Sequence, residues 1–327
     1  MTQAINIPPY VTGRPAQLGI FTDTPIPTTY VRLVIKDGLI TVIPARERGG
    51  PANKNMRGDV KATLLDIPHF PLGDAITPAD LQNLHAFGEE QQLLTLASVV
   101  NDKLTEIRGK HDATWNHLDW GALNGIVLDA EGKTLADLWT TFGITQEEVD
   151  FALGNTATNV AAKNGEVKSL IRKALRGTPS SGVIVFAGKA WFDAYVGHEF
   201  VRKALENYPG GTPNPARDDV ADRFAFRGLT SERIDEEFQV RLANGTFEAQ
   251  PAVAEDEAIA IPLGTPFFKR YVAPPDTIQD ANNAPRPGDK VFVSTDLLPH
   301  GKGMDIWTES NVLPICQRPD LMIKLTM

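Results

Sequence analysis

Four polar residues in the first half of the chain are of types that bind metal ions. His111, Asp112, His117 and Asp119 lie within nine residues of one another, and His and Asp are common ligands of divalent metals. The two histidines are six residues apart, which places them on different faces of a helix, and no Glu stands between a helically spaced pair as in zinc proteases. Hydrogen bonding at a helix end is therefore the interpretation we adopt, and a metal-dependent hydrolase using His111 and His117 is the alternative.

Other signatures of catalysis are missing from the sequence. There is no Gly-x-Ser-x-Gly turn, and Gly49-Gly50 lacks the Lys-Ser/Thr pair of a phosphate-binding loop. Cys316 is the only cysteine, so no intrachain disulfide can form, and we expect it to be a small buried side chain. Asp235 and Glu236 have no apolar run around them that would raise one pKa. The sequence predicts that the protein is not an enzyme and has no catalytic residue, bound metal or cofactor.

Composition places the chain among folded proteins without a membrane partner. It has 327 residues, 42% hydrophobic and 22% charged, and no apolar run of about 18 residues that would cross a membrane. The N-terminus lacks the basic start and apolar stretch of a secretory signal, so we expect assembly in the cytoplasm. A net charge of −9 argues against sequence-specific reading of nucleic acid, which needs a basic face.

Residues 44–61 form a polar segment between two β-rich stretches, 30–43 and 60–67. Its backbone groups would lack partners if they were buried, so we expect a loop that projects from the body. The segment carries five Arg or Lys residues against two acids, a net charge of +3 in an acidic chain. We predict a contact with another molecule, such as a second copy of the chain, and a DNA-binding module using residues 46–61 is the alternative. The candidate contact residues are Arg46, Arg48, Gly49, Gly50, Lys54, Arg57 and Lys61.

Residues 231–257 are the acidic counterpart, with eight acids against two arginines. A solvated acidic surface is one interpretation, and an electrostatic partner for a basic element is the other. On the second interpretation Asp235, Glu236 and Glu237 face the basic segment of a neighbouring copy.

Periodicity predicts an α+β chain without regular βαβ units. A hairpin is expected at Asp37-Gly38, and a long helix begins at Thr77-Pro78 and extends to about residue 116, with one apolar stripe. A Thr-Gln-Glu-Glu capping box at 145–148 indicates a further helix start. Two more helices are expected at 159–175 and 190–208, and strands at 125–128, 183–187, 223–228, 238–242, 258–263, 290–295 and 321–325.

Ordered motifs over residues 28–325 resemble the major capsid proteins of tailed phages, specifically the E family. No single motif is specific, but their order and spacing are. The chain departs from the family pattern at Pro275-Asp276, where Ala-Asp is usual, and at Asn311-Val312-Leu313-Pro314, where Asn-Pro-Leu is usual. The motifs occupy residues 48–51, 67–71, 86–88, 110–114, 121–132, 142–144, 226–229, 271–276 and 309–314.

The resemblance implies a Hong Kong 97-like capsid fold, α+β in class, in a virion shell that self-assembles around packaged double-stranded DNA. It implies an N-terminal arm (1–28), an extended loop (29–70), a peripheral domain with a long spine helix (71–180), a mainly axial domain (181–290) and a return to the peripheral sheet (291–327). Expected partners are copies of the chain in hexamers and pentamers, a portal and a decoration protein. Only about 28 residues precede the hairpin, so a separate scaffolding protein is also expected.

Overall fold

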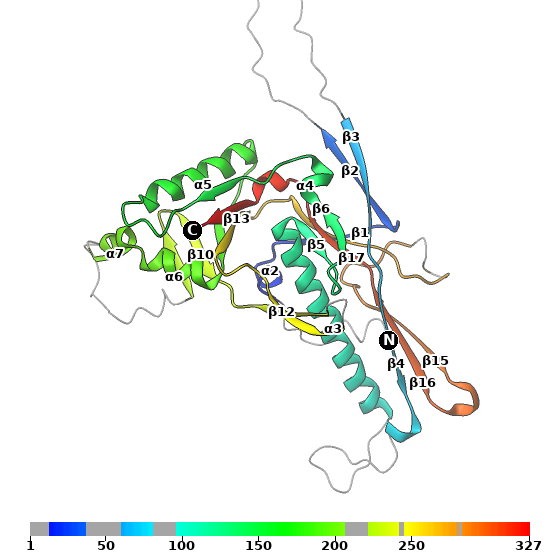
Figure 1. Ribbon diagram of the computed structural model, residues 1–327. Coiled ribbons are helices and arrows are strands. Elements are labelled where there is room, and N and C mark those ends of the chain that lie inside the picture. The colour runs from blue at the N-terminus through cyan, green and yellow to red at the C-terminus, as the bar shows by residue number, and fades with distance from the viewer. Residues whose placement is uncertain are drawn as a thin grey trace, which may run out of the picture.

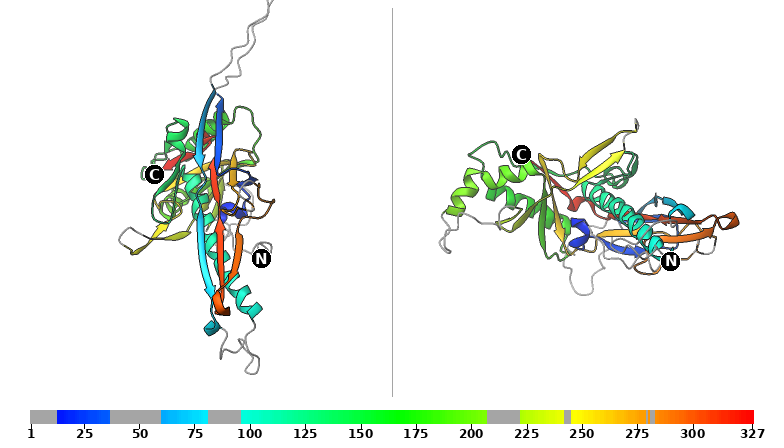
Figure 2. Two further views of the ribbon diagram at one scale, coloured as in Figure 1. Left: turned by 90° about the vertical axis from the view of Figure 1, so that its right-hand side faces the viewer. Right: turned by 90° about the horizontal axis from the view of Figure 1, so that it is seen from below.

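A computed structural model describes residues 13–36, 60–80, 96–206, 222–241, 245–278, 280 and 283–327. These residues form an elongated α+β molecule in which the β2–β3 hairpin and strand β4 follow one another along the long axis (Figures 1 and 2). Among the described residues, no helix is long and apolar enough to span a bilayer. The helices are α2 (Arg14–Gln17), α3 (Leu96–Asn124), α4 (Leu138–Phe142), α5 (Val160–Leu175), α6 (Lys189–Gly197) and α7 (Glu199–Glu206), with 3-10 turns at Pro78–Asp80, Pro299–Gly301 and Pro319–Leu321.

A six-stranded mixed sheet forms one end of the molecule. Its central strands read as continuous apolar runs because both of its faces are covered. One face packs against α5 and α6, and the other packs toward α3, where the rings of Trp120 and Phe186 meet edge to face at 5.1 Å. In spatial order the strands are β7 (Glu148–Asp150), β18 (Ile323–Thr326), β13 (Glu257–Leu263), β8 (Gly182–Ala187), β10 (Leu229–Arg233) and β9 (Arg223–Phe226).

Two three-stranded sheets continue the molecule away from that end. In the first, β1 (Thr22–Pro25) runs parallel to β14 (Phe268–Val272), which pairs with β17 (Val312–Cys316). In the second, β16 (Met304–Ser310) lies between β15 (Phe292–Leu297) and β4 (Phe70–Ile76). The C-terminal region therefore joins both ends of the molecule, because β16 pairs with β4 while β18 pairs with β13.

Three two-stranded ribbons complete the fold. Strand β2 (Tyr30–Lys36) pairs with β3 (Val60–Asp66), and both lie within the β-rich stretches that the sequence predicted around the polar segment. The predicted Asp37-Gly38 turn lies outside the described residues. The other ribbons are β5 (Ile126–Leu128) with β6 (Thr134–Asp137), and β11 (Glu237–Arg241) with β12 (Phe247–Pro251).

Helix α3 is the predicted spine, and it buries one apolar stripe that includes Leu104, Ile107, Trp115 and Leu118. It extends eight residues beyond the predicted end to Asn124, because its last turns pack against β5 and the core. At the predicted start, residues 78–80 form a 3-10 turn in which Asp80 accepts hydrogen bonds from the backbone and hydroxyl of Thr77. Residues 81–95 lie outside the described part of the chain.

Two predicted helices differ in the structure, and one is confirmed. The single helix expected at 190–208 is wrong, because the backbone at His198 is extended and divides it into α6 and α7. The imidazole of His198 accepts a hydrogen bond from the backbone of Phe200 and thereby caps α7. The capping box at 145–148 is also wrong, since Glu148 enters strand β7 and pairs with Lys324. Helix α5 matches its prediction, with Asn159 as its N-cap.

Candidate assembly surface around the spine helix

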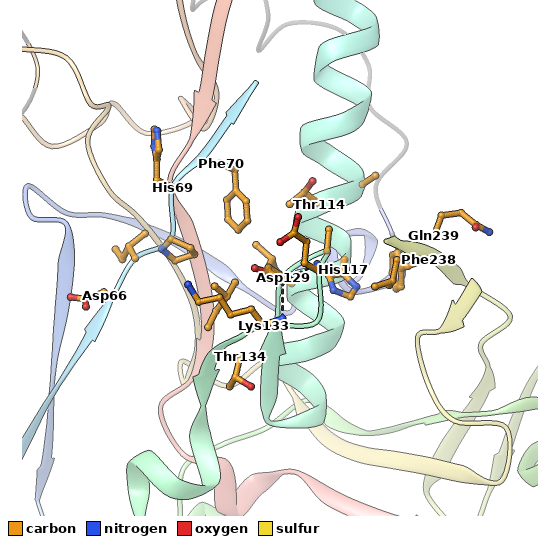
Figure 3. A pocket seen from close by; sticks show the side chains of 18 of the residues that line it. Asp66, His69, Phe70, Thr114, His117, Asp129, Lys133, Thr134, Phe238 and Gln239 are labelled. Atoms are coloured by element: carbon orange, nitrogen blue, oxygen red, sulfur yellow. Dashed lines mark hydrogen bonds between the residues drawn. The ribbon is translucent and has the colours of Figure 1, made fainter. Parts of the chain in front are cut away.

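A groove of about 840 Å³ lies beside the spine helix (Figure 3). Four segments that are distant in sequence form its walls: the β3–β4 connection, α3, the β5–β6 turn and β11. Each of the four segments packs against the core, and apolar side chains of each segment line the groove. The apolar lining includes Ile67, Phe70, Leu118, Leu135, Phe238 and Val240.

The rim of this groove is acidic. Asp66, Glu131 and Glu237 are exposed there, and none of the three forms an ion pair with another described residue. Asp129 is occupied within its own turn, since its carboxylate accepts the backbone N–H groups of Glu131 and Lys133 at 2.8 Å each. Lys133 is the basic residue of the lining. An apolar floor with an acidic rim is suited to a basic protein segment with apolar residues.

The four residues of α3 that could bind a metal ion contact other side chains of the protein instead, and His117 also lines the groove. His111 is buried with its ring nitrogens 3.0 Å from the Ser310 hydroxyl and 3.1 Å from the Thr308 hydroxyl. Burial lowers the pKa of His111 to about 4, so the imidazole is neutral at pH 7. The ring of His117 meets that of Phe238 edge to face at 5.1 Å. Among the described residues, no three His, Cys, Asp or Glu side chains are grouped to hold a metal ion.

The two acids of that group are paired with arginines. The carboxylate of Asp112 lies 2.7 Å from Arg108 Nε, yet burial raises its pKa to about 6. Asp119 forms a buried ion pair with Arg270, and burial raises its pKa. Arg270 also contacts Asp23 at 2.9 Å. The Asp112–Arg108 pair lies within α3, whereas the contacts of Arg270 join α3 and strand β1 to strand β14.

The three predicted contact acids have different surroundings. Asp235 is exposed and pairs with Arg233 at 2.7 Å. Glu236 is held inside the chain, where it accepts hydrogen bonds from the Arg14 backbone, the Asn116 amide and the Trp120 indole at 2.8–2.9 Å. Glu237 is exposed at the groove rim.

Of the predicted basic contact residues, Lys61 belongs to the described part of the chain. Arg46, Arg48, Gly49, Gly50, Lys54 and Arg57 lie outside the described residues. Lys61 is in strand β3, opposite Ile35. In the register of the ribbon, Lys36 and Val60 pair at the end opposite to the groove-lining Asp66.

Sequence reasoning missed a buried polar cluster at the end of β16. Four consecutive polar residues, 308–311, are buried and contact two histidines from different segments. His111 comes from α3, and His69, in the β3–β4 connection, has Nδ1 2.8 Å from Asn311 Oδ1. The available signal was a Thr-Glu-Ser-Asn run directly before an apolar strand. Buried polar side chains of this kind require partners that only the tertiary structure supplies.

Comparisons with known proteins agree with this architecture. The family described as "Phage major capsid protein E" matches residues 1–327. The major capsid protein of Pseudomonas phage KPP10 is 28% identical, with 99% of this chain and 95% of that protein aligned. The major capsid protein of Salmonella phage Felix O1 is 24% identical, with 99% and 94% aligned.

Solved phage capsids share the fold. A chain of the cyanophage A-1(L) capsid superposes with a TM-score of 0.51 at 11% identity, covering 98% of this chain and 94% of that one. A chain of the cyanophage P-SCSP1u capsid superposes with a TM-score of 0.50 at 10% identity, covering 94% and 86%. The Hong Kong 97-like fold class predicted from the resemblance is confirmed.

The family match decides between the functional alternatives. It covers the whole chain and is a family of structural shell proteins, so the alternative of a metal-dependent hydrolase is wrong. The alternative of a DNA-binding module is replaced by a place in the virion capsid. The chain belongs to the phage major capsid protein E family, and it is a major capsid protein that forms the shell of a phage head.

Proposed function

We propose that the chain assembles with copies of itself, as hexamers and pentamers, into an icosahedral shell that encloses double-stranded DNA. The observation that carries this proposal is the family match over all 327 residues. The elongated body supports it, because a molecule of this shape gains stability from neighbours packed along its sides. The remaining proposed partners are a separate scaffolding protein, a portal and a decoration protein.

The proposed division of the chain keeps the boundaries expected from the resemblance. An N-terminal arm (1–28) and an extended loop (29–70) precede a peripheral domain (71–180), a mainly axial domain (181–290) and a return to the peripheral sheet (291–327). Strands β8, β10 and β13 of the six-stranded sheet support the axial assignment. The three-stranded sheet of β15, β16 and β4 supports the return, whereas β18 lies in the six-stranded sheet.

The proposed contact between copies joins the basic segment of one chain to acids of the next. Its basic side consists of Arg46, Arg48, Lys54, Arg57 and Lys61 around Gly49-Gly50. Of the acids, Glu237 is the best placed, since it is exposed beside the apolar groove. Asp235 is also exposed, whereas Glu236 contributes mainly by holding α2 against α3.

Assembly tests this proposal directly. The full chain should sediment as capsomers or shells, and negative-stain electron microscopy should show particles. The variant R46Q/R48Q/K54Q/R57Q should remain small, because it removes four positive charges from the proposed contact. The matched variant K110Q/K189Q/R286Q/K302Q removes four charges from exposed basic residues that do not line the groove and should assemble normally. A stable small monomer under all conditions, or normal assembly by the first variant, would contradict the proposal.

A further inference from the structure

Helix α5 carries a concentration of positive charge that the shell contact described above does not use. Four basic side chains lie on the helix and a fifth, Arg176, is its C-cap, against the single acid Glu166. Glu166 forms an ion pair with Lys163 at 3.3 Å. The helix therefore has no second acid that could pair with its other cations. In a chain of net charge −9, this is a local reversal of sign.

The cations gather on the solvent side of the helix. Lys168, Arg172 and Arg176 are spaced by four residues, so they follow one another along the helix, about 6 Å apart at a rise of 1.5 Å per residue. Lys173 flanks this row. The opposite side is buried in the core through Val160, Asn164, Val167, Ile171 and Leu175. Figure 1 shows α5 lying along the outside of the six-stranded-sheet end of the molecule.

Arg227, in the β9–β10 turn, adds a further cation next to Lys168. Lys168 Nζ lies 3.3 Å from the backbone carbonyl of Arg227, and a Cβ at Gly228 would lie 2.4 Å from that Nζ, so the turn lies against the helix. Arg227 is exposed. The basic face of α5 therefore consists of Lys168, Arg172, Lys173, Arg176 and Arg227. No ion pair links Arg172, Lys173, Arg176 or Arg227 to another described residue.

Two of these arginines occupy backbone positions that favour glycine or asparagine. Arg176 has φ 49° and Arg227 has φ 51°, and each precedes a glycine that is also left-handed. Only four non-glycine residues in the described part of the chain have positive φ. A side chain at such a position strains the backbone. An Arg kept at both of these positions, where glycine would be less strained, indicates that the positive charge has a use.

The composition of the basic face favours a polyanion over a protein as its binding partner. Apart from the cations, the exposed residues of α5 are Ala162, Gly165, Glu166 and Ser169, and α5 contributes none of the exposed large hydrophobic side chains. Protein interfaces have an apolar centre that is depleted in Lys. A regular row of cations on a flat surface is instead typical of contacts with phosphates, which carry no sequence information.

We propose that the basic face of α5 binds the phosphate backbone of double-stranded DNA without reading its sequence. The inference rests on the proposed enclosure of DNA by the shell. Because the rest of the chain is acidic, each contact is weak, and the repetition of the face over many copies makes the total binding substantial. Weak individual contacts also leave the enclosed polymer free to slide.

DNA binding by the full-length chain tests the inference. The probe is a fluorescein-labelled DNA duplex of 30 base pairs and random sequence, and its anisotropy is followed from 50 to 200 mM NaCl. The variant R172Q/K173Q/R176Q removes three cations from the basic face. Its matched control, K189Q/R286Q/K302Q, removes the same charge from exposed basic residues on other surfaces. The wild type, the variant, the control and a blank without duplex are also examined by electron microscopy for assembly.

The inference predicts a specific loss in the first variant. Its affinity should fall at least tenfold relative to the control, and the slope of log K against log salt should become shallower by roughly 3, close to 0.9 per lost phosphate contact. Equal affinities in the two variants would overturn the inference, because net charge alone would then explain binding. If the first variant fails to assemble but binds DNA as the control does, the face contacts an acidic surface of a second copy, and the inference is also wrong. Normal assembly with lost DNA affinity supports it, and failed assembly by the wild type would contradict the proposed shell instead.

Discussion

Two adjacent residues of the spine helix respond to burial in opposite ways. Desolvation lowers the pKa of His111 to about 4 and raises the pKa of Asp112 to about 6, although Arg108 acts against the second shift. Relative to the unfolded chain, the folded chain binds fewer protons at His111 and more at Asp112 between pH 4 and pH 6. The two contributions to the free energy of unfolding therefore oppose each other over the same pH range.

Separate substitution of these residues should reveal the two contributions. The His111 contribution is complete above pH 6.5 and is lost as pH falls toward 4, by up to about 3 kcal/mol. The Asp112 contribution has the reverse sign, since ionisation of the buried acid above pH 6 destabilises the fold by a similar amount. Relative to wild type, H111Q should gain stability and D112N should lose stability as pH falls from 6.5 to 4. Urea unfolding followed by tryptophan fluorescence measures both, and slopes of the same sign would refute the assignment.

At the scale of one element, helix α6 contains a matched pair of glycines. Gly188 is its N-cap, and a Cβ added there would lie 2.0 Å from the carbonyl oxygen of Ala254. Gly197 is the last residue of the helix, and a Cβ there meets nothing within 4 Å. Substitution of glycine by alanine should therefore change the free energy of unfolding in opposite directions at the two ends of the helix.

We expect G188A to lower the free energy of unfolding by roughly 1–3 kcal/mol, because backbone atoms on both sides must move. G197A should raise it by up to about 1 kcal/mol, because alanine loses less conformational entropy in a helix. Thermal unfolding measures both variants against wild type. A stabilised G188A would show that β13 and the preceding loop yield more easily than the close contact implies.

At the scale of the molecule, Arg270 joins three segments that are far apart in the chain. It contacts Asp23 of β1 and Asp119 of α3 from its place in β14. Arg270 is 5% exposed and Asp119 1%, so each ion depends on its partner for compensation. The cluster fixes the position of the N-terminal strand against the spine.

Removing only Arg270 should lower the free energy of unfolding more than removing both members of the Asp119–Arg270 pair. R270M leaves Asp119 buried without its cation, so we expect the free energy of unfolding to fall by about 3–5 kcal/mol. The double variant D119N/R270M has no uncompensated charge there and should recover a substantial part of that loss. A double-mutant cycle in urea measures the coupling between the two residues. Additive effects would show that water or a rearranged side chain compensates Asp119.

Local patterns predicted several of the individual elements, although strands such as β4, β14, β16 and β17 were not predicted. The apolar stripe of α3, the Asn159 cap of α5 and the apolar run of β8 depend on neighbours a few residues away, which the sequence displays directly. The break at His198 was not predictable in this way, because its imidazole is held by the carbonyl of Asn155, 43 residues earlier. Glu148 likewise joins a strand because Lys324 lies beside it, although its local sequence resembles a helix start.

By itself the sequence determined the class of the chain, its family and the separation of a basic segment from an acidic body, because composition and the order of motifs are properties of the chain alone. Only the tertiary structure decided what the polar residues of α3 do. It pairs Asp112 and Asp119 with arginines, encloses His111 between hydroxyls of β16 and places Glu237 beside a groove built from four distant segments. A side chain's charge state and partners depend on which residues surround it in space, and those neighbours are brought together only by the packing of the whole fold.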